Sequence, residues 1–299
     1  MKFKNVLVTG SGGLLGRHVV RELRAHCTVS GFDLKRSVED VAQCIGDMTD
    51  IAAVRAACAG KDAVVHVAAL PNIWSGPGER ILNVNVAGTW NVLKAAEDSG
   101  STRVILCSSD SVAGFTVLSG AMHRPEFAPL DDTHPLRPTD PYALSKLLGE
   151  QIGRSFVDRG TLEVLALRPV FVLYDEMVAE VRARAQDPGN YNGPAAGGPS
   201  AAGGGPLWHY VDPRDVARAF RLALEALVLP KFEGLFISAK STLAPEPTIE
   251  RLEQFLGQKV EVRNPGLYAR NPYAPLYDLS RARDVIGYEA EHDLRHLID

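Results

Sequence analysis

Tyr142 and Lys146 are residues whose types and spacing could move a proton. They lie four positions apart in the run 141–146, PYALSK, and on a helix this spacing places both side chains on one face. A free tyrosine has a pKa of about 10 and is a poor base at neutral pH, but a nearby ammonium group favours the phenolate. Such a phenolate could take a hydroxyl proton while hydride leaves the same carbon for an acceptor. The pair therefore predicts oxidation of an alcohol, or the reverse reaction.

Ser109 is a candidate partner for this pair. It ends an apolar run, 103–109, that is expected to form a buried strand. Ligands of α/β proteins bind at the carboxyl ends of such strands, so the Ser109 hydroxyl could orient a substrate oxygen. Tyrosine and lysine often occur at this spacing by chance, and the prediction therefore also rests on a glycine-rich turn near the N-terminus.

This turn spans residues 9–16, with the sequence TGSGGLLG, between an apolar run and a stretch of helical periodicity. Gly10 permits the tight turn, Gly13 lets the backbone approach a pyrophosphate, and Gly16 allows close helix–strand packing. The N–H groups at the start of the helix favour the pyrophosphate charge. The turn therefore predicts a dinucleotide cofactor, whose oxidised nicotinamide would accept hydride and further favour the phenolate.

Asp33 closes the second predicted strand and indicates which dinucleotide is bound. A carboxylate at this place accepts hydrogen bonds from the ribose hydroxyls and repels a 2′-phosphate, which favours NAD over NADP. Lys35 and Arg36 follow closely. They could hold a phosphate, although solvated loop charges are the simpler interpretation.

The elements that must position these residues alternate along the chain. Strands are expected at 5–9, 28–32, 41–45, 63–69, 103–109, 162–167, 235–238 and 260–263. Helices are expected from Leu14, after an N-cap at Thr49, and at 79–98, 141–157, 213–228, 248–256 and 279–286. Strands separated by helices predict an α/β fold, a Rossmann-type doubly wound parallel sheet with a small C-terminal α/β substrate cap.

The same pattern suggests two parts of the chain. Residues 1–170 are expected to form an NAD-binding Rossmann domain, to which late elements near 207–240 return. Residues 171–299 would mainly form the substrate-binding cap. Within the cap, residues 187–206 hold seven Gly, four Pro and four Ala, a composition that predicts a flexible loop.

Composition excludes several classes of protein. The 299 residues carry 32 Lys and Arg against 36 Asp and Glu, a formal net charge of −4, which argues against a nucleic-acid partner on bulk charge. The apolar runs are too short for a signal peptide or a membrane helix, so we expect no membrane partner and a cytoplasmic enzyme with a small-molecule substrate. The irregularly spaced cysteines are expected to be reduced: Cys27, Cys44, Cys58 and Cys107.

Taken in order, these motifs resemble the extended branch of the short-chain dehydrogenase/reductase family, the NAD-dependent epimerase/dehydratase type. The similarity runs from residue 5 to about 175 and more weakly to the end. Besides the glycine turn and 142–146, it rests on GDMTD at 46–50, HVAA at 66–69, NVAGT at 85–89, Ser108-Ser109 and LRP at 167–169.

The resemblance implies roles for particular residues. Ser109, Tyr142, Lys146 and Asn85 would form the catalytic set, in which Asn85 supports the hydrogen-bond network. The family often dimerises through its two long helices, which implies a homodimer. Contacts to NAD are expected from Gly10, Gly12, Gly13, Leu14, Leu15, Gly16, Asp33, Asp47, Met48, Val67, Ala68, Ala69, Ser108, Tyr142, Lys146, Pro169 and Phe171.

Departures from the family pattern bear on the substrate. Dehydratases of this branch carry Thr-Asp-Glu where this chain has residues 109–111, SDS, so the acid–base glutamate of dehydration is missing. Nucleotide-sugar epimerases usually have Asn at the position of Phe171. Trp208 stands where they have a diphosphate-binding Arg, and it cannot pair with a diphosphate. Arg214 could substitute, or it could be a surface residue. Substrate contacts are expected from Asn72, Ser109, Asp110, Phe171, Trp208 and Arg214, and no metal site is expected.

The sequence thus predicts an NAD-dependent oxidoreductase that transfers hydride at a secondary alcohol of a sugar-like or other polar small molecule. The departures favour a dehydrogenase with a non-nucleotide substrate. A UDP-sugar 4-epimerase is one alternative. A non-catalytic NAD-binding sensor or scaffold is the other, since some relatives keep the fold and lose the chemistry.

Overall fold

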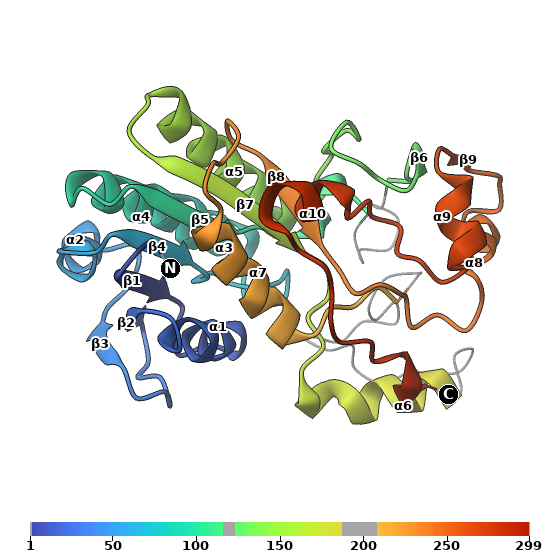
Figure 1. Cartoon of the computed structure of the whole chain (residues 1–299), viewed down its shortest axis with the longest axis horizontal. Helices are drawn as coiled ribbons and strands as arrows, with labels where there is room; N and C mark the ends of the chain where they lie inside the picture. The colour runs from blue at the N-terminus through green and yellow to red at the C-terminus, as the bar shows by residue number, and fades with distance from the viewer. Residues whose placement is uncertain (1, 116–122, 187–207, 299) are drawn as a thin grey trace.

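A seven-stranded parallel sheet forms the centre of the computed structural model, which describes residues 2–115, 123–186 and 208–298 (Figure 1). The strand order is β3-β2-β1-β4-β5-β7-β8, and every neighbouring pair is parallel. The strands are β1 (Asn5–Thr9), β2 (Thr28–Asp33), β3 (Ala42–Ile45), β4 (Ala63–His66), β5 (Arg103–Cys107), β7 (Glu163–Pro169) and β8 (Gly234–Ile237). The expected doubly wound α/β fold is therefore confirmed.

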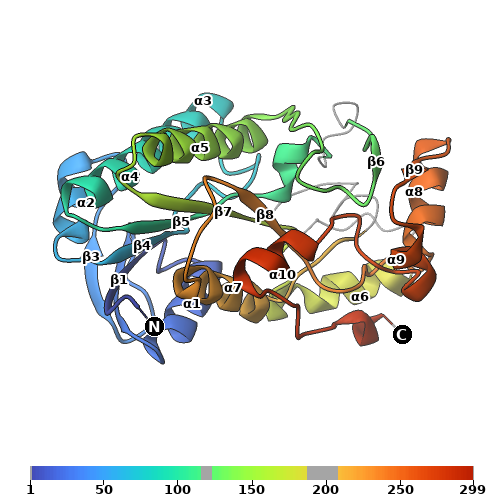
Figure 2. The same ribbon diagram turned by 45° about the horizontal axis from the view of Figure 1, so that its top comes forward.

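Helices cover both faces of this sheet, as the side view in Figure 2 shows. One face carries α1 (Leu14–Arg24) and α7 (Pro213–Glu225), and the other carries α2 (Ile51–Cys58), α4 (Gly88–Asp98) and α5 (Pro141–Asp158). Side chains of one strand alternate between the two layers. In β1, for example, Val6 and Val8 join the core under α1 and α7, whereas Leu7 joins the core under α4 and α5.

The strand order reverses between β1 and β4, which creates a crevice at the carboxyl ends of the strands. From β1 the chain winds outwards to β2 and β3, then returns to β4 on the other side and continues to β5, β7 and β8. The loops that follow β1 and β4 therefore leave in opposite directions, and doubly wound proteins bind their ligands at this point.

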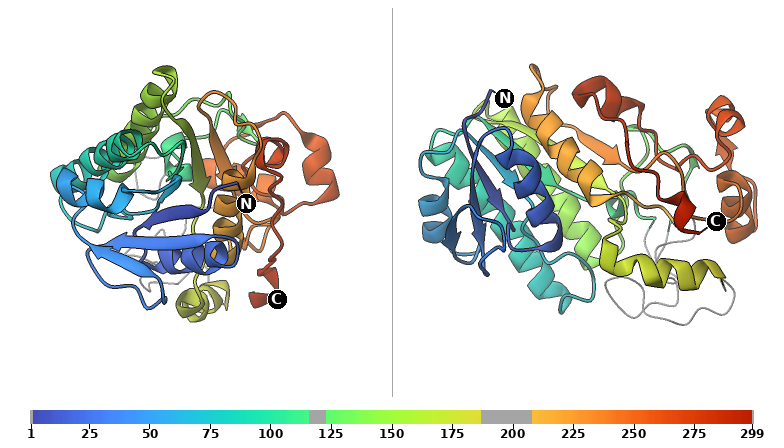
Figure 3. Two further views of the ribbon diagram at one scale, coloured as in Figure 1. Left: turned by 60° about the vertical axis from the view of Figure 1, so that its left-hand side comes forward. Right: turned by 60° about the horizontal axis from the view of Figure 1, so that its bottom comes forward.

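Most of the later elements gather beyond the carboxyl ends of the strands, as the two views in Figure 3 show. They are β6 (Phe127–Ala128), η3 (Asp175–Met177), α6 (Val178–Gln186), α8 (Thr248–Leu256), β9 (Glu261–Val262), α9 (Pro265–Arg270) and η4 (Arg295–Leu297). By contrast, α10 (Ser280–Ile286) packs on β8 and α7. β6 pairs with β9, although they are far apart in the sequence. The segments at β6, α6 and α9 carry short or irregular patterns and were not predicted. The expected loop at 187–206 lies outside the described residues.

Several expected boundaries differ from the structure, and the differences have local causes. Asp50, not Thr49, caps α2, because its carboxylate accepts from the N–H groups of Ala52 and Ala53. β4 ends at His66 because only one more ladder bond follows: the N–H of Val67 still donates to the Thr9 carbonyl, but the N–H of Ala68 turns to the Thr9 hydroxyl. β5 ends at Cys107, since Ser109 begins a short helical turn.

The expected long helix at 79–98 is not regular. It consists of α3 (Gly78–Leu82), a π-helical turn at Asn83–Ala87 and α4. A π-helical turn inserts extra backbone into a helix and often marks a functional place. None of the helices in the described ranges is long and apolar enough to cross a membrane.

Candidate active site

The glycine turn after β1 is shaped by two close backbone approaches. Gly10 has a φ of 73°, and a Cβ at this position would lie 2.6 Å from the N atom of Ala68. A Cβ at Gly16 would overlap the carbonyl oxygen of Gly10. At Gly13, by contrast, the nearest atom to a Cβ is the Gly10 oxygen at 3.3 Å. Gly10 and Gly16 are therefore required by the protein's own packing, whereas Gly13 leaves room for a ligand.

The start of α1 can receive that ligand. Gly13 is the N-cap residue and supplies no side chain, so no side-chain hydrogen bond caps this helix. The first N–H groups of a helix need acceptors, and a phosphate satisfies them. These features fit the pyrophosphate of a dinucleotide.

Asp33 lies at the end of β2, next to this turn. Its carboxylate accepts hydrogen bonds from the N–H of Gly12 at 2.9 Å and of Lys35 at 3.0 Å. Both contacts hold the carboxylate beside the glycine turn, where ribose hydroxyls of a bound dinucleotide would be within reach.

Tyr142 and Lys146 are positioned by the beginning of α5. Asp140 caps the helix by accepting from the N–H of Ala143 at 2.8 Å, and Pro141 fills the first turn. The Lys146 ammonium lies 5.7 Å from the centroid of the Tyr142 ring and donates to the carbonyl oxygen of Cys107 at 2.8 Å. Tyr142 and Lys146 therefore lie on the same face of α5, as expected.

Ser109 faces this pair from the end of β5. It is the N-cap of the short turn η2 (Asp110–Ala113) and accepts from the N–H of Ser111 at 3.2 Å. Gly114, with a φ of 82°, packs so tightly on the carbonyl of Arg137 that a Cβ would overlap it. This contact ties the loop after Ser109 to the segment that leads into α5.

Burial governs the electrostatics of the site. It raises the pKa of Tyr142, while a hydrogen bond with Ser109 acts in the opposite direction. It also lowers the pKa of Lys146. The Lys146 ammonium, which is expected to favour the Tyr142 phenolate, donates its hydrogen bond to the Cys107 carbonyl in this structure.

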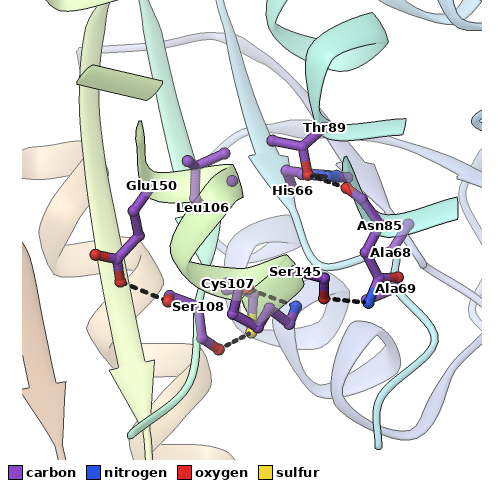
Figure 4. Close-up of a pocket in the computed structure, with 12 residues that line it drawn as sticks. His66, Ala68, Ala69, Asn85, Thr89, Leu106, Cys107, Ser108, Ser145 and Glu150 are labelled. Atoms are coloured by element: carbon purple, nitrogen blue, oxygen red, sulfur yellow. Dashed lines mark hydrogen bonds between the residues drawn. The ribbon is translucent and has the colours of Figure 1, made fainter. Parts of the chain in front are cut away.

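Asn85 joins three segments of the chain, and Figure 4 shows its hydrogen bond to Ser145 of α5. It lies in the π-helical turn and donates to the Ser145 hydroxyl at 2.9 Å, next to Lys146. Its amide also donates to the carbonyl of Leu70 and accepts from the N–H of the same residue. The buried amide therefore fixes α5 relative to the loop after β4, which is a positioning function.

A second buried network lies beside Lys146. Arg168 donates to both carboxylate oxygens of Glu150, at 2.8 and 2.7 Å, and the Ser108 hydroxyl donates to Glu150 at 2.5 Å. Ser108, a predicted cofactor contact, is thus engaged with α5. Glu150 and Arg168 link β7 to α5 and were not singled out from the sequence.

Other predicted cofactor residues are placed around the crevice. Asp47 accepts from the N–H and hydroxyl of Thr49, and the Met48 side chain packs against Gly88 of α4. Ala68 and Ala69 line the same pocket as Asn85 and Lys146. The remaining predicted contacts lie at strand or helix ends near the crevice: Leu14 and Leu15 at the start of α1, Val67 after β4, Pro169 at the end of β7, and Phe171 shortly beyond.

The predicted substrate residues are not all brought together. Asn72 shapes its own loop by accepting from the Trp74 N–H and the Ser75 hydroxyl. Trp208 is buried in an apolar cluster of the cap. The Arg214 guanidinium pairs with both oxygens of Asp212, in a hollow beside α1 that none of the catalytic set lines. Asp110 lies directly beside Ser109.

Three functional candidates were missed by the sequence analysis. The Tyr277 hydroxyl donates to Asp110 at 2.8 Å. The hydroxyls of Ser111 and Thr139 are buried near the catalytic set without a hydrogen-bond partner in the described part of the chain. Nothing local distinguishes these residues in the sequence. No three His, Cys, Asp or Glu side chains of the described ranges are grouped as a metal site.

The fold and the glycine turn fit a dinucleotide-dependent α/β oxidoreductase, and Tyr142 and Lys146 are its candidate catalytic pair. The family model for the NAD dependent epimerase/dehydratase family matches residues 6–231. The chain therefore belongs to the NAD-dependent epimerase/dehydratase family. It is an NAD-dependent enzyme, as the sequence predicted.

Relatives with known activities support this assignment. L-arabinose 1-dehydrogenase (NAD(P)(+)) of Haloferax volcanii is 34% identical over 180 residues, which are 58% of this chain and 70% of that protein. Uronate dehydrogenase of Agrobacterium fabrum is 33% identical over 173 residues, 55% of this chain and 60% of that protein. Among solved structures, a short-chain dehydrogenase/reductase superfamily protein from Agrobacterium tumefaciens with bound NAD has a TM-score of 0.72 and 28% identity, covering 98% of this chain and 94% of that chain.

Proposed function

We propose that this enzyme is a dehydrogenase that oxidises a secondary alcohol of a small, non-nucleotide sugar with NAD. The observation that carries the proposal is the convergence of Ser109, Tyr142 and Lys146 beside the glycine turn. The names of two relatives, an arabinose dehydrogenase and a uronate dehydrogenase, support the substrate class.

Each of the three side chains would have its own function in the reaction. Tyr142 takes the proton from the substrate hydroxyl as the carbon–hydrogen bond breaks. Lys146 stabilises the phenolate and holds a ribose of the cofactor, and Ser109 orients the substrate oxygen. Bound NAD supplies the hydride acceptor and a positively charged ring beside the tyrosine.

The surroundings of the site support a substrate without a diphosphate. Trp208, which stands at the position of a diphosphate-binding arginine, is packed in the cap cluster, and Arg214 is already paired with Asp212. The buried hydroxyls of Ser111 and Thr139 could pair with sugar hydroxyls. Asn72, Asp110 and Phe171 stay proposed substrate contacts.

A UDP-sugar 4-epimerase is the second candidate. The 4-epimerase reaction, but not the UDP-sugar substrate, is supported by one relative, N-acetyl-alpha-D-glucosaminyl-diphospho-ditrans,octacis-undecaprenol 4-epimerase of Escherichia coli O157:H7, which is 31% identical over 172 residues, 56% of this chain and 49% of that protein. In an epimerase the oxidised intermediate would be reduced again on its other face before release.

We also propose that the enzyme is a homodimer, that it is cytoplasmic and that its chain has two parts. Trp90 of α4 and Leu144 and Leu148 of α5 are exposed apolar side chains on two adjacent long helices, which supports a homodimer through this face. The four free thiols fit a reducing compartment such as the cytoplasm. We keep the division into 1–170 and 171–299, with α7 and β8 packing on the first part.

A substrate panel tests the activity. The enzyme is incubated with NAD and aldoses, uronic acids or UDP-sugars, while NADH absorbance and sugar isomers are followed. We expect NADH to accumulate with an aldose or uronic acid. Isomer formation from a UDP-sugar without net NADH would establish the epimerase instead, and no turnover with intact NAD binding would favour a sensor.

A further inference from the structure

His66 is a buried histidine at the end of β4, and the proposed reaction does not use it. The residue is 4% exposed, and its ring lies between two threonines. Its Nδ1 atom is 2.7 Å from the Thr9 hydroxyl, and its Nε2 atom is 3.1 Å from the Thr89 hydroxyl, a contact drawn in Figure 4. Thr9 ends β1 just before the glycine turn, and Thr89 is in the first turn of α4. The imidazole therefore joins the glycine turn to a helix on one face of the sheet.

The direction of the hydrogen bond between His66 and Thr89 follows from the next partner along. The Thr89 hydroxyl donates its single hydrogen to the backbone carbonyl of Asn85 at 2.7 Å, because a carbonyl can only accept. Thr89 Oγ can therefore only accept from the histidine. The ring hydrogen of His66 must lie on Nε2 for this contact to be a hydrogen bond.

The other half of the ring is fixed in the same way. With its hydrogen on Nε2, a neutral imidazole has a bare Nδ1, which accepts the hydrogen of the Thr9 hydroxyl. Thr9 Oγ in turn accepts from the backbone N–H of Ala68 at 3.2 Å. Burial, and to a smaller extent the charge of Lys146, lowers the pKa of His66 to about 3, so the ring is neutral near neutral pH. One tautomer thus satisfies every hydrogen bond from the Ala68 N–H to the Asn85 carbonyl.

The two ends of this row of hydrogen bonds contact the glycine turn and the helix of the candidate catalytic pair. Ala68, a predicted NAD contact, lies so close to Gly10 that a Cβ there would be 2.6 Å from the Ala68 N atom. At the other end, the Asn85 side chain donates to the Ser145 hydroxyl at 2.9 Å, which donates to the Tyr142 carbonyl at 2.7 Å. A change of direction in the row would therefore reach both ends.

We propose that His66, as its Nε2–H tautomer, is a positioning residue that couples the glycine turn that binds NAD to the helix of Tyr142 and Lys146. With the hydrogen on Nε2, the Thr9 oxygen accepts only from the Ala68 N–H. With the hydrogen on Nδ1, the same oxygen would have to accept from the ring as well, and Nε2 would have no hydrogen for Thr89. The inference concerns the NAD site and does not depend on which sugar is oxidised.

Thr89→Val tests this coupling in the complete, NAD-free protein. Valine has nearly the size of threonine and removes the acceptor of the Nε2 hydrogen. NMR of the histidine ring nitrogens should show the hydrogen on Nε2 in the wild type and a shift towards Nδ1 in the variant. The Ala68 amide hydrogen should then exchange with solvent about tenfold faster, as expected when about one hydrogen bond is lost.

Calorimetric titration with NAD measures the functional consequence. Thr89 is not a predicted NAD contact, so a purely local role would leave the NAD affinity unchanged. We expect the Kd for NAD to rise about tenfold in Thr89→Val. Thr89→Ser keeps the hydroxyl and should keep both the wild-type tautomer and the wild-type Kd.

Thr248→Val is the matched control. The Thr248 hydroxyl is also fully buried and donates to the carbonyl of Ala274 at 2.7 Å, in the C-terminal part of the chain. This variant loses a hydrogen bond of the same kind without contact to His66. Its His66 tautomer, Ala68 exchange and NAD affinity should equal those of the wild type, even where its melting temperature is lower.

Three results would overturn the proposal. They are a wild-type His66 with its hydrogen on Nδ1, a Thr89→Val protein that binds NAD like the wild type, and a loss of NAD affinity with unchanged His66 and Ala68 signals. If Thr89→Val does not fold, Thr89→Ala provides the same measurements without added bulk. None of these measurements uses a sugar, so a failed substrate panel would refute the dehydrogenase and leave the coupling of His66 to be judged by NMR and calorimetry.

Discussion

Burial shifts the pKa values of Tyr142 and Lys146 in opposite directions for the same physical reason. It disfavours the charged form of each group, so the pKa of the phenol rises and that of the ammonium falls. With its pKa raised, Tyr142 by itself would be a poor base at neutral pH. The positive charge of bound oxidised nicotinamide would add to the Ser109 hydrogen bond and to Lys146 in favouring the phenolate, which would couple proton transfer to the presence of the cofactor.

Tyr142→Phe separates catalysis from cofactor binding. The variant keeps the ring and removes the group that exchanges the proton, so kcat should fall by about 10²–10⁴. Calorimetric titration should show NAD affinity within about threefold of wild type, because Lys146 and the glycine turn are retained. Tyr268→Phe, which loses a hydroxyl bonded to the Pro275 carbonyl, is the control. Undiminished turnover in Tyr142→Phe would exclude Tyr142 as the base.

Asp33→Asn tests the choice between NAD and NADP. The amide keeps the size of the side chain but no longer repels a 2′-phosphate, and Lys35 stays nearby. We expect the ratio of kcat/KM for NADP to that for NAD to rise at least about tenfold. Asp131→Asn is a matched control, since Asp131 also accepts from the N–H two residues on. An unchanged ratio in Asp33→Asn would mean that the carboxylate does not face the ribose.

At the scale of elements, the turn between β1 and α1 and the start of α5 position most of the candidate site residues. The turn brings an uncapped helix start to the switch point of the sheet. Asp140 and Pro141 fix the first turn of α5 and hence the direction of Tyr142. The π-helical turn before α4 places Asn85 against the same helix.

Two glycine substitutions in the turn should have different consequences. Gly16→Ala introduces a Cβ that overlaps the Gly10 carbonyl, so we expect a lower melting temperature and weaker NAD binding. In Gly13→Ala the new Cβ lies 3.3 Å from one protein atom, the carbonyl oxygen of Gly10. The melting temperature should therefore change little, while NAD binding is lost. Gly266→Ala in α9 should change neither. Unimpaired NAD binding in Gly13→Ala would refute the proposed path of the pyrophosphate.

For the whole molecule, buried hydrogen bonds hold the C-terminal residues against α7 and the segment that precedes it. Asp215 of α7 is fully buried and accepts from the N–H groups of Glu291 and His292. Tyr210 donates to Asp293 at 2.7 Å and accepts from the N–H of Leu294. These contacts anchor the end of the chain close to the elements that hold Tyr277.

The proposed dimer is tested on the exposed face of α4 and α5. Leu148→Glu places a charge where an apolar contact is expected, and burying it unpaired would cost several kcal/mol. We expect light scattering to show a monomer for this variant and a dimer for wild type. Leu227→Glu, at an apolar residue that is 90% exposed elsewhere, should stay dimeric. A dimeric Leu148→Glu would place the interface on another face.

Much of the fold was predictable because its signals are local. Apolar runs, helical periodicity and the glycine turn each depend on neighbours within a few residues, and they predicted the sheet, the family and the NAD cofactor correctly. The spacing of Tyr142 and Lys146 follows from the pitch of a helix. The end of β4 and the cap of α2 were misplaced by a few residues, because two hydrogen bonds decided them: the N–H of Ala68 donates to the Thr9 hydroxyl, and the N–H of Ala52 donates to the Asp50 carboxylate.

The sequence by itself determined the class of enzyme and its NAD cofactor and indicated the glycine turn and the candidate catalytic pair, since these signals depend on short-range geometry. The tertiary structure alone decided that Trp208 is buried in the cap, that Asn85 fixes α5 through a π-helical turn, and that Tyr277 reaches Asp110 across 167 positions of the chain. Such contacts depend on how distant segments pack against one another, and no local sequence pattern predicts that packing.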